Sequence, residues 1–294
     1  MTSDIKPLSK LPLGPKFWTG VITIPFVILL LYFGGWPMFI VATAAMLVGL
    51  HEFYRGVARN GIVAVAPAGW ACATGIMAAT HFVAENPALR SGMITVCVAG
   101  AVLLAFMAQF WRAGHTSVIA NTGATVFGVV WVGLLFSFLL RLRAVPLHHV
   151  GGIPEGGFLD RCGALVLIIT TVWMQDTMAA LVGKSLGTRR SFPGISPNKT
   201  WEGHIGGLLT AVIVCVGLGS SFGLQPLHMI SLGIVIGVFG QLGDLAKSMI
   251  KRELGIKDFG TILPGHGGIL DRFDSLLFTM PIAYMYFRLF VIPT

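Results

Sequence analysis

The residues best suited to do chemistry lie between positions 243 and 274, where ten side chains are charged. Lys247, Ser248 and Lys251 follow Asp244 by three, four and seven residues. On a helix, residues at these spacings share one face. Lysines at the end of a membrane helix often extend their amines to the interface, which explains the cations. It does not explain an aspartate one turn deeper, since ionisable groups inside a membrane are costly and usually functional. We therefore interpret this face as part of a functional site.

A glycine-rich loop, Pro-Gly-His-Gly-Gly at residues 264–268, follows this face. Backbone N–H groups in such a loop can approach a ligand closely, because little side-chain bulk covers them. An ordinary turn would use the same residues. The loop, however, leads directly into three charged residues at the start of the predicted last span: Asp271, Arg272 and Asp274. This continuity favours a ligand-binding role for His266, Gly267 and Gly268.

Three aspartates could supply oxygen ligands to a cation. Asp244 and Asp271 belong to separate predicted helices at the same membrane depth, and ligation by oxygen alone favours Mg²⁺. Asp176 lies inside the predicted span 162–183, about 10 Å below its inner boundary at 1.5 Å per residue. An isolated acid at that depth could relay protons, bind a metal or hydrogen-bond to a neighbouring helix.

Two further acids have structural interpretations. Asp274 stands at the start of the last predicted span, where the helix dipole would stabilise a carboxylate. Glu52 ends the second predicted span three residues before Arg55. A lone buried acid there could be functional, but we favour an interfacial ion pair between Glu52 and Arg55.

A second polar region is the predicted inner loop 184–203, which contains Ile-Ser-Pro-Asn-Lys-Thr-Trp-Glu-Gly from residue 195. Lys199 supplies positive charge, and Ser196 and Asn198 can donate hydrogen bonds to phosphate oxygens. The usual excess of cations on the inner side of a membrane accounts for the arginines of the loop. It does not account for the prolines and glycine that fix the backbone shape. The spacing matches neither the P-loop nor the dinucleotide-binding pattern.

The composition indicates a membrane protein. Charged residues make up 11% of the 294-residue chain, against about 25% in an average soluble domain, and 55% of the residues are hydrophobic. The mean hydropathy is +0.82. The net charge of +8 reflects cationic cytoplasmic loops better than nucleic-acid binding. The four cysteines show no spacing typical of disulfides or zinc sites.

Nine stretches are apolar enough to span a bilayer, so we expect an all-α, polytopic membrane protein. They lie near residues 17–33, 36–50, 63–84, 92–110, 118–140, 162–183, 204–222, 228–246 and 273–292. A cytoplasmic N-terminus puts 15 of the 20 Lys and Arg residues inside, as the positive-inside rule requires, and leaves the C-terminus outside. We divide the chain into N-terminal membrane helices, 1–117, and a C-terminal catalytic region, 118–294, with cytoplasmic loops 184–203 and 247–272.

The segment from Ser248 to Asp274 reads SMIKRELGIKDFGTILPGHGGILDRFD and resembles the signature of the phosphatidate cytidylyltransferase family. The stretch ISPNKTWEGHIGG from residue 195 is similar to a loop of that family, as is the span around Asp176. That span departs from the family pattern in carrying Ala180 and Leu181 where aromatic residues are common. The resemblance is strong over residues 160–294, and weaker before them.

The resemblance implies transfer of CMP from CTP to phosphatidic acid, giving CDP-diacylglycerol and pyrophosphate, in a bacterial inner membrane with the active site cytoplasmic. It also implies that the reaction requires Mg²⁺, and it allows a second, monovalent cation at the metal site. A homodimer is suggested by the same resemblance. Asp244 and Asp271 are then expected to bind the metal, with Asp176 nearby. Lys251 and Arg272 are expected to act on the phosphates in catalysis. The other expected substrate-binding residues come from both polar regions: Ser196, Asn198, Lys199, Ser248, Arg252, Lys257, Asp258, His266, Gly267, Gly268 and Asp274.

Other functions use some of the same residue types. The CDP-alcohol phosphotransferases also use membrane aspartates, but the residues after Asp244 lack their glycine and arginine, and the gap from Asp271 to Asp274 is one residue too short. A secondary transporter could use Asp176 as an ion site, yet no inverted repeat is visible and the charges cluster at one membrane face. Cytidylyl transfer to another lipid phosphate, or phosphorylation of a lipid alcohol, stays open.

Overall fold

The computed structural model describes residues 25–111, 117–150, 153–260 and 267–292. Most of these residues are helical. The α-helices are α2 (Gly35–Ala58), α3 (Ala66–Phe82), α4 (Pro87–Phe110), α5 (Val118–Gly128), α6 (Leu135–Arg143), α7 (Phe158–Ser185), α8 (Trp201–Ser221), α9 (Pro226–Glu253) and α10 (Leu270–Tyr286). A π-helical segment, Val129–Leu134, joins α5 to α6, and a second, Phe287–Val291, continues α10. A 3₁₀ turn, His148–Val150, precedes α7.

Six of the described helical segments are long and apolar enough to cross a membrane: α2, α4, the continuous segment Val118–Arg143, α7, α8 and α9. This confirms that the chain is a mainly helical, polytopic membrane protein. The helices α3 and α10 have 17 residues each, fewer than the roughly 20 that a bilayer requires. Of the predicted first span, residues 17–24 lie outside the described residues, and residues 25–33 are helical. The count of nine spans therefore stays a prediction.

Several helices begin where local sequence signals place them. Proline occupies the first turn of α3, α4 and α9, where its missing N–H group costs no helical hydrogen bond. The side chain of Asn86 caps α4 by accepting a hydrogen bond of 3.0 Å from the Leu89 N–H. Thr200 caps α8 in the same way, accepting from the Gly203 N–H at 3.2 Å.

The predicted inner loop 184–203 contains a β-hairpin, so the fold is not purely α-helical. Strand β1 (Arg190–Phe192) pairs antiparallel with β2 (Ser196–Thr200), and Arg190 lies opposite Thr200. Because Thr200 also caps α8, the second strand leads into that helix without an intervening loop. The hairpin therefore holds Lys199 at a fixed distance from the start of α8.

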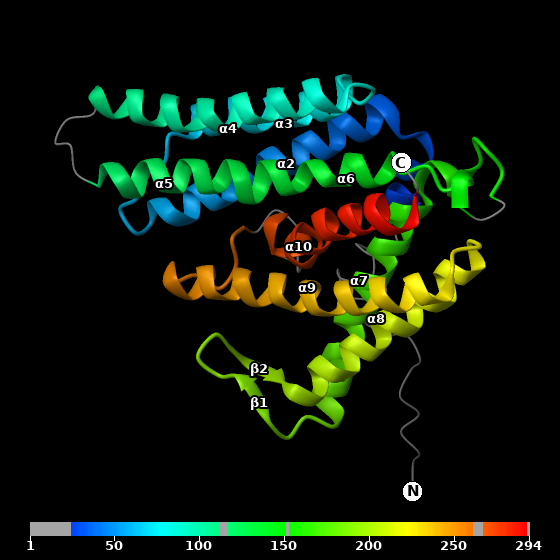
Figure 1. Ribbon diagram of the computed structural model, residues 1–294. Helices are drawn as coiled ribbons and strands as arrows, with labels where there is room; N and C mark the ends of the chain where they lie inside the picture. The colour runs from blue at the N-terminus through cyan, green and yellow to red at the C-terminus, as the bar shows by residue number, and fades with distance from the viewer. Residues whose placement is uncertain (1–24, 112–116, 151–152, 261–266, 293–294) are drawn as a thin grey trace, which may run out of the picture.

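The helices form two groups joined by α10. In Figure 1, α2 to α6 lie together, α7 to α9 form a second group, and α10 lies between α6 and α9. Apolar side chains of both groups and of α10 belong to one buried cluster, which includes Leu50, Phe136, Ile168 and Met280. The start of α10 thus lies where elements from both groups can reach it.

Candidate active site

Charged side chains from the hairpin, α9 and α10 form a connected cluster. Lys199 of β2 lies 2.5 Å from Asp244 of α9, and Lys247 lies 3.2 Å from the other oxygen of the same carboxylate. Lys247 also pairs with Asp274 of α10. The spacing of three residues between Asp244 and Lys247 places both on one face of α9, as the sequence analysis predicted.

Lys247 is the most enclosed cation of this cluster. Its side chain is 9% exposed. Besides the two carboxylates, it donates a hydrogen bond of 3.3 Å to the backbone carbonyl of Asp271. A buried ammonium group needs such partners, because the cost of removing it from water is several kcal/mol. Lys247 therefore joins α9 to the first turn of α10.

Asp271 lies beside this cluster but has partners of its own. One carboxylate oxygen accepts a hydrogen bond of 3.0 Å from Lys251. The other accepts backbone N–H groups of Phe259 at 2.9 Å and of Gly268 at 3.2 Å. Asp271 thereby holds Phe259 and Gly268 on the two sides of residues 261–266, which lie outside the described residues. The predicted site residue His266 is one of the residues outside the described part of the chain.

Asp176 of α7 faces the same cluster. It is exposed, and it interacts electrostatically with Asp244, Asp274 and Lys199. Asp176 is therefore near enough to the cluster to feel its charges. The structure places Asp274 next to Asp244, a position that the sequence analysis assigned to Asp271.

The remaining predicted site residues lie on the elements that carry the cluster or directly next to them. The Arg252 guanidinium donates through Nε to the carbonyl of Ile195 at 3.0 Å, so it holds the hairpin against α9. The Ser248 hydroxyl donates to the Asp244 carbonyl at 2.8 Å within α9. The other predicted residues that are exposed lie on β2, after α9 and in the first turn of α10: Asn198, Lys257, Asp258 and Arg272. Ser196 is half-buried on β2, and Gly267 has a positive φ of 82° ahead of Gly268.

Two contributors to the site are not among the site residues predicted from the sequence. The first is His204 of α8, which bonds through Nδ1 to Gln241 Oε1 at 2.6 Å and through Nε2 to the Ser191 hydroxyl at 3.0 Å. Gln241 donates in return to the His204 carbonyl at 2.8 Å, so α8, α9 and β1 are held together near Lys199. No spacing pattern in the sequence predicts this network, and the polar residue types were the only signal for it.

The second is Glu52, for which the expected ion pair with Arg55 is wrong. Within the described residues, Glu52 accepts hydrogen bonds from the backbone N–H groups of Ile269 and Leu270 instead. Its depth on α2 explains the difference, because Glu52 is 3% exposed while Arg55 is exposed. A buried acid at a helix end was the available signal.

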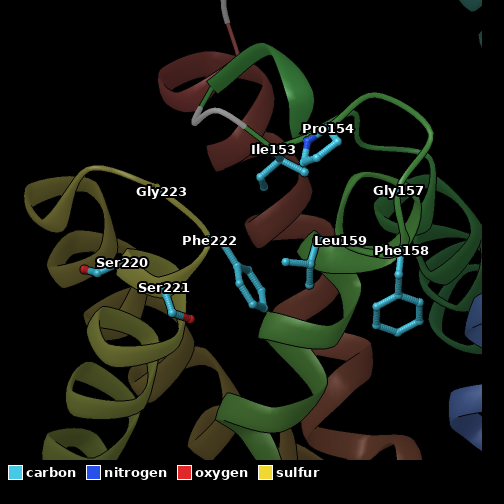
Figure 2. Close-up of a pocket in the computed structure, with 9 residues that line it drawn as sticks. All are labelled: Ile153, Pro154, Gly157, Phe158, Leu159, Ser220, Ser221, Phe222 and Gly223. Carbon is cyan, nitrogen blue, oxygen red and sulfur yellow. The ribbon is translucent and has the colours of Figure 1, made fainter.

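A separate pocket lies at the opposite end of α7 from Asp176 (Figure 2). It lies between the residues before and in the first turn of α7 and the turn that joins α8 to α9, and Phe158, Leu159 and Phe222 are among its lining residues. Phe158 precedes Asp176 by 18 residues, or about 27 Å along a helix. None of the lining residues is charged. The pocket is therefore distinct from the charged cluster.

Comparisons with known proteins agree with the motifs. A family model described as the cytidylyltransferase family matches residues 16–290. The phosphatidate cytidylyltransferase of Bacillus subtilis (strain 168) is 37% identical over 186 residues, which cover 60% of this chain and 64% of the relative. That of Staphylococcus aureus (strain COL) is 40% identical over 159 residues, which cover 53% and 55%. The chain thus spans less than two thirds of the length of these curated relatives.

Proposed function

The chain belongs to the cytidylyltransferase family, and from this premise we propose that it transfers CMP from CTP to phosphatidic acid. The products are CDP-diacylglycerol and pyrophosphate. The observation that carries the proposal is the cluster of Lys199, Asp244, Lys247 and Asp274, in which groups suited to phosphates and to a metal ion meet at one place. The proteins named as phosphatidate cytidylyltransferases supply the substrate class.

The reaction needs positioning and charge neutralisation more than proton transfer. A phosphate oxygen of phosphatidate attacks the α-phosphorus of CTP, and a new P–O bond forms while the bond to the bridging oxygen of the β-phosphate breaks. Pyrophosphate leaves with that electron pair. The attacking phosphate is already ionised at neutral pH, so no general base is required. Lys199 and Lys251 are the cations placed to bind the reacting phosphates, since their side chains are partly exposed.

The oxygen donors of the cluster suit a divalent cation. The carboxylates of Asp176, Asp244, Asp271 and Asp274 outnumber the ammonium groups of Lys199, Lys247 and Lys251 by one. Carboxylates this close together would repel the phosphates of a nucleoside triphosphate, and one bound Mg²⁺ would offset two of their negative charges.

We propose that Asp244 and Asp271 hold Mg²⁺, with Asp176 beside them. Among the described residues, no three His, Cys, Asp or Glu side chains are already grouped as a metal site. Asp271 would therefore exchange its contact with Lys251 for the ion, and Lys251 would then be released toward phosphate. When bound, the ion would neutralise charge on the departing pyrophosphate.

The proposal places the charged cluster at the cytoplasmic face of a bacterial inner membrane, with the N-terminus inside and the C-terminus outside. The excess of cations in the loops near the cluster supports this orientation. The acyl chains of phosphatidate would stay in the bilayer, so the lipid would enter from the inner leaflet. The resemblance to the family also leads us to propose a homodimer.

The decisive experiment measures pyrophosphate release by the purified protein in detergent. Release that requires both CTP and phosphatidate, with CDP-diacylglycerol as lipid product, would support the proposal. Diacylglycerol in place of phosphatidate tests phosphorylation of a lipid alcohol. CTP hydrolysis that is indifferent to lipid, or solute uptake into proteoliposomes without CTP, would contradict it.

A further inference from the structure

Glu52 of α2 makes a contact that reaches across most of the chain to the start of α10. Its carboxylate accepts a hydrogen bond from the Ile269 N–H at 3.2 Å and another from the Leu270 N–H at 3.0 Å. The partners are separated by 217 and 218 residues in the sequence. Glu52 is 3% exposed, so little water competes for this carboxylate.

The N–H groups of Ile269 and Leu270 lie at the start of α10, where no carbonyl of the same helix can accept from them. The first residues of any α-helix lack intrahelical acceptors for their N–H groups, and a side chain at the N-cap usually supplies one. The N-cap residue of α10 is Ile269, whose side chain has no acceptor and makes no capping hydrogen bond. Glu52 fills this role from another helix, and its negative charge also suits the helix dipole.

Gly260 and Gly268 both approach this carboxylate closely. A Cβ atom on Gly268 would lie 2.5 Å from Glu52 Oε2, and one on Gly260 would overlap the Glu52 carboxylate as well. Neither glycine has a positive φ. Close approach to Glu52, and not backbone conformation, therefore explains why these positions lack side chains.

The capped turn carries the acids of the charged cluster. Asp271 follows Leu270 directly, and Asp274 lies one turn further along α10. Both acids are connected to α9, Asp271 through Lys251 and Asp274 through Lys247. A shift of the first turn of α10 would move both acids relative to Asp244.

We propose that Glu52 is a positioning residue of the active site, which holds the first turn of α10 in register with α9. It acts through the backbone and does not contact substrate. The inference rests on the proposed cytidylyl transfer, and it gives the N-terminal helices a part in that reaction.

Replacing Glu52 in the full-length protein tests this role. Glu52→Gln keeps the shape and one acceptor, and Glu52→Ala removes both. We expect kcat to fall in that order, by about tenfold or more for the alanine variant. The loss of kcat should exceed the loss of folded protein, although the unpaired N–H groups also lower the unfolding temperature in detergent. Glu85→Gln, at an exposed position in the turn after α3, is the matched control and should behave as wild type.

Amide hydrogen exchange gives a readout that does not depend on catalysis. The N–H groups of Ile269 and Leu270 should exchange faster in Glu52→Ala than in wild type, with Glu52→Gln in between. Wild-type kcat and wild-type exchange in Glu52→Ala would overturn the inference. So would a loss of kcat fully matched by a loss of folded protein, because that result assigns Glu52 a merely structural role.

A double variant tests the contact itself. Gly260→Ala should lower kcat because its Cβ meets the Glu52 carboxylate, and adding Glu52→Ala should cost less than the two single effects combined. Gly92→Ala, which has open space around it, is the control. Strict additivity would overturn the inference. A wild-type protein without CTP- and phosphatidate-dependent activity would instead refute the proposed function, so the two failures are distinguishable.

Discussion

Lys247 of α9 and Asp274 of α10 form an ion pair in which each side chain is only 9% exposed. A buried pair of this kind contributes less to stability than the attraction between its charges suggests, because both ions give up their hydration. It does make the relative position of α9 and α10 specific, since Asp274 would stay buried without the cation that it pairs with if the two helices moved apart. The pair thus couples the integrity of the fold to the geometry of the charged cluster.

Removing one member of this pair should be costly. Lys247→Met leaves Asp244 and Asp274 without their shared cation, and we expect a loss of about 3 kcal/mol in unfolding free energy. Thermal unfolding in detergent measures the effect. Lys184→Met, at an exposed position on α7, serves as the control and should change stability little. Equal stabilities of the two variants would show that the buried pair is not required for the fold.

Lys199 should matter for activity more than for folding. Its ammonium group is partly exposed beside Asp244, so it can turn toward a bound phosphate. We expect Lys199→Ala to lower kcat/KM for CTP by about a hundredfold, in line with the loss of one donor that stabilises transition-state charge. Steady-state pyrophosphate release reports the change, with Lys184→Ala as a comparison of equal charge. Unchanged kcat/KM in Lys199→Ala would remove this lysine from the proposed mechanism.

Activity should require a divalent cation and return when Mg²⁺ is added back after chelation. If Asp244 and Asp271 bind the ion, Asp244→Asn and Asp271→Asn should each raise the Mg²⁺ concentration for half-maximal activity by about tenfold or more. Asp274→Asn should lower stability through Lys247 with a smaller effect on the Mg²⁺ requirement. The reverse pattern, with Asp274→Asn raising the requirement and Asp271→Asn not, would move the second ligand to Asp274.

Close helix packing should depend on individual glycines of α8. A Cβ atom on Gly207 would lie 2.9 Å from the Ala179 Cβ atom of α7, whereas a Cβ on Gly217 of the same helix would meet nothing within 4 Å. We expect Gly207→Ala to destabilise the protein by about 1–3 kcal/mol, because an overpacked contact forces the helices apart. Gly217→Ala should have no such cost. Unfolding temperatures of the two variants, compared in one detergent, decide between them.

The sequence by itself determined the membrane character, the extents of most helices and the residues of the polar regions. These features are local: apolar runs specify spans, prolines and caps specify helix starts, and a spacing of three residues puts Asp244 and Lys247 on one face. The family signature is local too, since it is a continuous run from Ser248 to Asp274.

Only the tertiary structure decided which of these residues meet. Asp271 and Asp274 are three residues apart on α10. We expected Asp271 beside Asp244, and the packing of α10 on α9 put Asp274 there in the structure. The cap that Glu52 provides could not be foreseen from spacing, because its partners are backbone N–H groups more than 200 residues away. Backbone groups are the same at every position, so no side-chain pattern marks them. The physical reason is that a buried acid takes whichever donors the packing of distant helices presents to it.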